Sequence, residues 1–97
     1  MGKKPAKFDV SDYLDNERII TEYLTSILET GNISLLISAI GDIAKAKGMG
    51  QVAEKSGLGR ESLYKALKSD SQPRFETIVK VLDSLDIKVK FEGKYSS

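Results

Sequence analysis

The stretch that decides the fold is residues 49–68, which read MGQVAEKSGLGRESLYKALK. Its spacing of glycine and leucine predicts two short helices, over residues 50–56 and 60–67, joined by a tight turn at Gly57. The segments before and after it have apolar residues at helical spacing as well. The stretch therefore belongs to a larger helical domain.

The apolar residues of this stretch set the angle between the two short helices. Ala53 is small where the second helix crosses the first, and four residues later Gly57 can adopt the positive φ of a tight turn. Leu58 and Leu63 point inward, together with Val52, Ala66 and Leu67. This spacing predicts a helix-turn-helix over residues 49–68, whose second helix protrudes far enough to enter a DNA major groove.

The polar residues of the second short helix face outward and are candidates for contacts with DNA. Arg60, Glu61 and Lys65 lie near its start and one turn later, where side chains reach base edges. Arginine and lysine suit guanine, and glutamate suits the cytosine amino group. The candidates for phosphate contacts, through side chains or helix-start N–H groups, are Gly50, Gln51, Gly59, Ser62, Tyr64 and Lys68. Two ordinary amphipathic helices of a bundle are the alternative interpretation.

Outside this stretch the chain divides into four parts. Residues 1–8 are a lysine-rich, flexible basic arm, and residues 9–31 form an N-terminal helical extension with a helix from Asp15 or Asn16. Residues 32–86 are the helix-turn-helix domain; Asn32 caps its first helix, and Gly41 marks a close helix crossing. Residues 87–97 are a C-terminal strand and tail. The predicted fold is all-α, a bundle of five to six helices with one short β-strand.

The C-terminal segment predicts a dimer contact. Ile87, Val89 and Phe91 alternate with lysines, which is a strand signal. A strand left unpaired at an edge is a liability, and pairing with its copy across a twofold axis removes it. The alternative is a strand that folds back on its own domain.

The composition argues against an enzyme. The chain has no cysteine and no histidine, which removes disulfides, thiolate nucleophiles and the commonest general base and metal ligand. No metal-loop spacing and no glycine-rich phosphate loop is visible, so we expect no metal site and no cofactor. No apolar run approaches the roughly 18 residues of a membrane span. We expect a cytoplasmic protein that makes no membrane contact.

The sequence resembles the Cro/cI-type (XRE-like) helix-turn-helix domains and, more closely, the addiction-module antidote family of prokaryotic toxin–antitoxin pairs. The run Arg60–Leu67 is the most specific match. The other shared positions are Phe8-Asp9, Tyr13-Leu14, Gly41–Ala44, Gly48-Met49, Gly57-Leu58, Pro73, Phe75, Thr77 and Val81-Leu82. The resemblance implies a lambda-repressor-like fold in a prokaryotic or phage protein. It also implies a double-stranded DNA operator, autorepression, and a small cognate toxin of the RelE-like ribonuclease class.

Four positions depart from the family pattern, one of them Gln72, where the family tends to have asparagine before the proline. Gly50 and Gly59 stand where the family commonly has serine at the caps of the two short helices, and glycine is a slightly weaker cap. Asp86 stands where glycine often ends the last helix, and aspartate tolerates that backbone geometry less well.

The N-terminal extension is the candidate surface for the implied toxin. Residues 9–30 carry six acidic residues against one basic residue, a net charge of −5 in a chain whose total is +1. An acidic helix suits a basic, RNA-cleaving partner through complementary potential. The candidate contacts are Asp12, Asp15, Glu22 and Tyr23. The alternative is that this helix only completes the bundle.

Two other functions remain open at this point. A stand-alone repressor of phage type would bind DNA without a toxin. A protein-interaction module would keep the helix-turn-helix but not bind DNA, and salt-sensitive DNA binding would exclude it.

Overall fold

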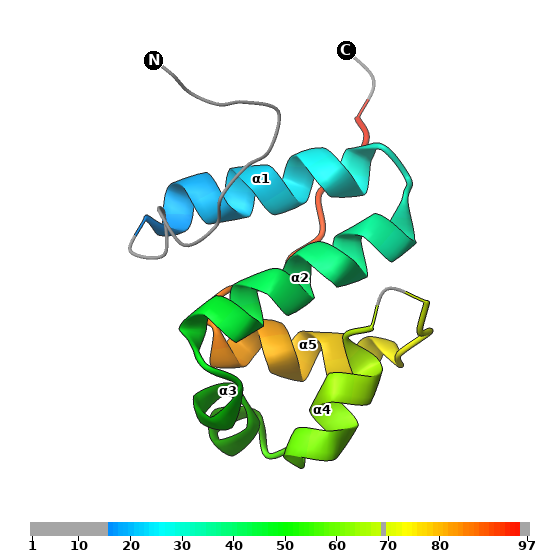
Figure 1. Cartoon of the computed structure of the whole chain (residues 1–97). Helices are drawn as coiled ribbons and strands as arrows, with labels where there is room; N and C mark the ends of the chain where they lie inside the picture. Colours follow the sequence, from blue (N-terminus) through cyan, green and yellow to red (C-terminus); the bar gives the residue numbers. More distant parts are fainter. Residues whose placement is uncertain (1–15, 69, 96–97) are drawn as a thin grey trace, which may run out of the picture.

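The computed structural model describes residues 16–68 and 70–95, in which all regular structure is helical (Figure 1). The five helices are α1 (Glu17–Glu29), α2 (Ile33–Lys47), α3 (Met49–Ser56), α4 (Arg60–Ala66) and α5 (Phe75–Ser84). This confirms the predicted helical bundle and the two short helices in the middle of the chain. Within the described residues, no helix is long and apolar enough to span a membrane.

Two asparagines define where the first two helices begin. The Asn16 side chain accepts a hydrogen bond from the Ile19 N–H at 3.2 Å, and that of Asn32 accepts one from the Leu35 N–H at 3.0 Å. Each satisfies a donor that the helix itself leaves without a partner. The predicted cap at Asn32 is confirmed. The residues that cap α3, α4 and α5 make no such side-chain hydrogen bond.

A single core joins all five helices. Helix α1 packs against α2, while α3 contacts α2, α4 and α5. The largest fully buried side chains come from four helices and are Ile40, Ile43, Val52, Leu63 and Val81. Helix α1 adds Ile20, Leu24 and Ile27 to the same core. Helix α1 is therefore an integral layer of the bundle and lies at the end opposite α3 and α4 (Figure 1).

Gly41 brings α2 into close contact with the end of α4, as the sequence predicts. A Cβ atom at this position would lie 3.0 Å from the carbonyl oxygen of Leu67 and 3.4 Å from its Cβ. Because a side chain would force the backbones apart, only glycine fits without a shift. This contact holds the segment after α4 against the middle of α2.

The predicted strand over residues 87–91 is wrong for the single chain. Residues 87–95 have no regular secondary structure, although Ile87 packs against the core. Val89 and Phe91 are exposed, Phe91 by 88%. A strand is defined by hydrogen bonds to a neighbouring strand, and the described chain supplies none. The alternative that the segment folds back as a strand on its own domain is likewise absent from the described residues.

Candidate nucleic-acid interface

The turn between α3 and α4 has the backbone conformation that the sequence predicts. Gly57 has φ = 79° in the left-handed region, and its N–H donates to the Ala53 carbonyl at 3.0 Å. The Ser56 hydroxyl accepts from the Leu58 N–H and donates to the Ala53 carbonyl, each at 3.3 Å. These bonds close α3 and set the direction in which the chain enters α4.

Helix α4 is held to the bundle by one face. Leu63 is its buried residue, with no exposed surface, and Leu67 directly after the helix is also buried. Ala53 and Val52 are buried on α3, and Leu58 packs against the core from the turn. Five of the residues predicted to fix the two helices therefore lie in or against the core, whereas Ala66 is only half-buried. The opposite face of α4 is left to solvent.

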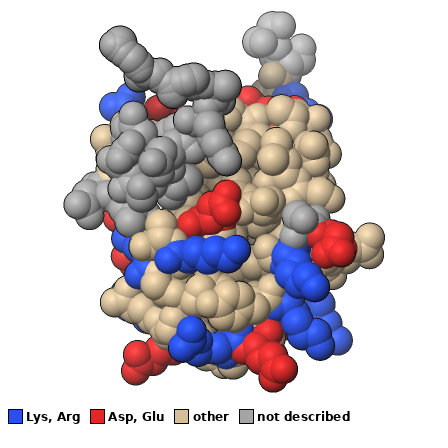
Figure 2. Space-filling model, in the orientation of Figure 1, with Lys and Arg blue, Asp and Glu red and all other residues tan. Residues whose placement is uncertain are grey.

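The exposed face of α4 carries the predicted DNA contacts. The candidates for base reading, Arg60, Glu61 and Lys65, are all exposed. The phosphate candidates Gly50, Gln51, Gly59, Ser62, Tyr64 and Lys68 are exposed as well. In Figure 2 basic side chains gather over the end of the molecule where α3 and α4 lie, with acidic side chains among them. The structure thus leaves these candidates open to solvent on or beside α3 and α4.

One detail of the predicted caps is wrong. Helix α3 begins at Met49 and its N-cap residue is Gly48, so Gly50 lies within the first turn. Gly48 has φ = 113°, which only glycine adopts readily, and this lets the chain turn into α3 directly after α2. Gly59 is the N-cap of α4, as expected.

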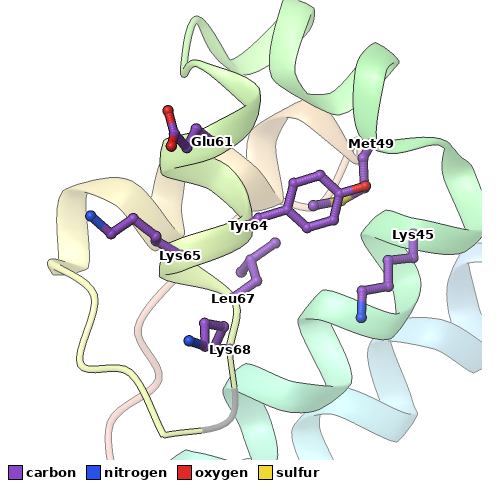
Figure 3. Close-up of a pocket in the computed structure, with 7 residues that line it drawn as sticks. All are labelled: Lys45, Met49, Glu61, Tyr64, Lys65, Leu67 and Lys68. Atoms are coloured by element: carbon purple, nitrogen blue, oxygen red, sulfur yellow. The ribbon is translucent and has the colours of Figure 1, made fainter.

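A groove of about 500 Å³ runs between α4 and the end of α2 (Figure 3). Its lining residues are Lys45, Met49, Glu61, Tyr64, Lys65, Leu67 and Lys68. Lys45 reaches it from α2, across from Lys68, with Leu67 and Tyr64 between them. Lys45 was not among the residues predicted from the sequence. The available signal was its position one helical turn after Gly41, on the side of α2 that contacts Leu67.

The lysines of the groove, and Arg60 at the start of α4, make no ion pair with a described residue. In the described part of the chain, Lys45, Arg60, Lys65 and Lys68 have no carboxylate within 4.0 Å, since the ion pairs there are Arg18–Glu22 and Lys80–Glu76. An unpaired lysine that is already solvated can neutralise a phosphate without first breaking a salt bridge. The groove and the α4 face together form a surface suited to a polyanion.

The candidate toxin contacts on α1 differ in character. Glu22 is exposed and pairs with Arg18 at 3.3 Å. Tyr23 is partly buried against the core, and its pKa is raised by burial and, to a smaller extent, by the nearby Asp42 carboxylate. Tyr23 therefore has a packing role whatever else it contacts. Asp12 and Asp15 lie outside the described residues.

A protein-family model described as "Probable addiction module antidote protein" matches residues 4–93. The chain belongs to this antidote family. A protein of Haemophilus influenzae described as uncharacterized is 44% identical over 92 residues, which are 95% of each chain. No solved structure matches the sequence. An antidote acts on a toxin, so membership of the antidote family implies a cognate toxin partner.

Proposed function

We propose that this antidote is a DNA-binding antitoxin that neutralises a RelE-like ribonuclease toxin and represses its own operon as a homodimer. Its role is binding rather than catalysis, in the cytoplasm of a prokaryote or phage. The main support is the exposed polar face of α4, which Leu63 anchors at a fixed angle to α3. A helix held in this way docks in the major groove of a helix-turn-helix complex, with the N-terminal part of the helix over the bases.

The side chains of α4 divide into two roles in this proposal. Arg60, Glu61 and Lys65 read base edges, because they occupy the first turns of α4 and point away from the core. Lys68 and Lys45 border the groove on opposite sides, where they suit the phosphates that flank a major groove. Lys45 is therefore a further phosphate contact, supplied by α2.

The first test is the fluorescence anisotropy of labelled DNA from upstream of the gene, beside a scrambled duplex, at two salt concentrations. We expect tighter binding to the native duplex and weaker binding at high salt, since phosphate neutralisation releases counterions. Equal binding to both duplexes would remove sequence-specific repression. Absence of binding to either would leave the protein-interaction module as the better description.

Two lysine substitutions separate the proposed roles. Lys65→Ala should reduce discrimination between the two duplexes by roughly 1–3 kcal/mol, because Lys65 contacts a base. Lys45→Ala should weaken binding to both duplexes equally and lower the slope of log affinity against log salt by about 1. Lys47→Ala is the matched control, since Lys47 is exposed on the same helix but does not line the groove. Equal effects of Lys45→Ala and Lys47→Ala would remove the contact from α2.

The toxin-binding half of the proposal rests on family membership and on the acidic surface of α1. Co-purification with the small protein encoded by the neighbouring gene tests it directly. Glu22→Lys, which reverses an exposed charge on α1, should weaken that complex and leave DNA binding unchanged. A chain that binds its operator but no neighbouring gene product would instead be a stand-alone repressor.

A further inference from the structure

The C-terminal segment has the pattern of a β-strand over a longer stretch than residues 87–91. Ile87, Val89, Phe91 and Tyr95 occupy odd positions, with Gly93 between the last two, and every even position from Lys88 to Lys94 is charged. Side chains of a strand alternate between its two faces, so this pattern separates one apolar face from one charged face. A nine-residue stretch such as this is long enough for a stable ladder.

This segment has no partner within the described chain. After the Ile87 N–H, which donates to the Leu82 carbonyl at 2.9 Å, the backbone groups of residues 88–95 make no hydrogen bond to another described residue. Phe91 and Tyr95 are each 88% exposed. An apolar strand face and an unpaired row of backbone groups are what another strand would cover.

We propose that residues 87–95 pair antiparallel with the same segment of a second copy, with Phe91 on the twofold axis. The proposal specifies the interface of the homodimer named above. It does not depend on DNA binding, because the pairing exists in the free protein.

The side-chain pattern limits the possible registers. In an antiparallel pair, residues directly opposite each other point to the same face. A twofold axis that passes beside one residue pairs odd-numbered residues of one copy with odd-numbered residues of the other. The apolar side chains of the two copies then lie on the same face. An axis between two residues is excluded, because it would set each residue opposite one that points to the other face of the sheet.

Among the registers that remain, the one centred on Phe91 is favoured because it pairs all nine residues of the segment and its central charges are complementary. It places Lys90 opposite Glu92 of the second copy, and Glu92 opposite that copy's Lys90, on both sides of the axis. This register also places Lys88 opposite Lys94 of the second copy, near the exposed ends of the ladder. Salt screens the repulsion between two such exposed charges. An axis at Val89 places Lys88 opposite Lys90 near the centre, and an axis at Lys90 places two lysines on the axis itself.

The apolar face favours the same register. Phe91 meets its own copy, Ile87 lies opposite Tyr95, and Val89 lies opposite Gly93. A Cβ atom at Gly93 would lie 2.6 Å from the Tyr95 ring, so this ring already covers the glycine in the single chain. The aromatic ring thus fills the space beside the glycine, and the opposing valine packs beneath it.

Single cysteines test the register cleanly, because the chain has none of its own. Opposite residues of an antiparallel pair have Cα atoms about 4.5–5.5 Å apart, within the roughly 4.4–6.8 Å that a disulfide spans. Phe91→Cys should therefore form a disulfide-linked dimer under mild oxidation. Tyr95→Cys is the matched control, with the same 88% exposure, and its two copies would lie about 27 Å apart.

Each result has one meaning. Cross-linking of Phe91→Cys far above that of Tyr95→Cys supports the pairing, and equal cross-linking of the two overturns it. Lys90→Cys cross-linking ahead of Phe91→Cys overturns the register centred on Phe91, in which the two Lys90 Cα atoms are roughly 8 Å apart.

A second measurement does not depend on cysteine chemistry. Phe91→Asp places two like charges on the axis and should convert the dimer to a monomer in sedimentation equilibrium without DNA. Phe75→Asp, at an exposed phenylalanine of α5, should leave the dimer intact. A Phe91→Asp chain that remains dimeric overturns the proposal. Loss of DNA binding alone does not, since both experiments omit DNA.

Discussion

Truncating Leu63 to alanine should destabilise the whole domain and abolish DNA binding. Leu63 has no exposed surface and is the buried residue of α4. Leu→Ala changes at such sites cost about 3–5 kcal/mol, because a cavity remains where the side chain was. A domain of this size has a total stability of about 5–10 kcal/mol. Since α4 has only seven residues, it cannot remain helical once its anchor is lost.

Urea unfolding followed by circular dichroism measures this effect. With a denaturant slope of about 1–2 kcal/mol/M, a loss of about 3 kcal/mol lowers the midpoint by roughly 1.5–3 M. Leu35→Ala is the control, because Leu35 is 47% exposed and should cost less than about 0.5 kcal/mol. Equal costs for the two substitutions, or native DNA affinity in a folded Leu63→Ala chain, would refute the role of Leu63 as the anchor of α4.

Three further predictions concern caps, backbone conformation and pH. Asn32→Ala should lower the free energy of unfolding by about 1 kcal/mol, because the Leu35 N–H loses its hydrogen-bond acceptor. Thermal unfolding measures this loss, and an unchanged midpoint temperature would contradict the prediction. Gly57 and Asp86 both have positive φ, which glycine adopts at lower cost than other residues. Gly57→Ala should therefore lower the free energy of unfolding by about 1–2 kcal/mol, and Asp86→Gly should raise it by up to about 1 kcal/mol. Changes of the same sign in the two variants would exclude φ as the cause. The pKa of Tyr23 is higher in the folded chain than its ordinary value of 10.0, which applies to the unfolded chain. The contribution of Tyr23 to the free energy of unfolding is therefore fully present below pH 10.0, and it is lost as the pH rises through the higher pKa of the folded chain. The difference in urea stability between the native chain and Tyr23→Phe should therefore change above about pH 10 and stay constant below it.

The helices could be predicted because their signals are local. Asn32 stands at the start of an apolar stripe, and Gly41 interrupts the stripe without a helix break, which indicates a close crossing. The alternation at residues 87–91 is equally local, but a strand needs a partner strand, and the described residues supply none. The predicted strand is therefore wrong for the described residues, because alternation in one segment does not show whether a partner strand is present.

The predicted site was incomplete for a related reason. The exposed side chains of α4 followed from spacing within one helix. Lys45 joins them only because the contact between Gly41 and Leu67 places α2 beside α4, and a contact between distant segments is not visible in either segment alone. The start of α3 was misplaced because Gly48, rather than Gly50, supplies the positive φ at the junction.

The N-caps of the helices predict a higher local stability for α1 and α2 than for α3 and α4. Asparagine side chains close the starts of α1 and α2, whereas glycine stands at the starts of α3 and α4 and contributes no side-chain hydrogen bond. Backbone amides of α3 and α4 should therefore exchange with solvent through local openings that leave α1 and α2 closed. In the proposed complex, a DNA duplex that binds only the closed form would suppress these openings, so its apparent affinity would include the local folding equilibrium of α3 and α4.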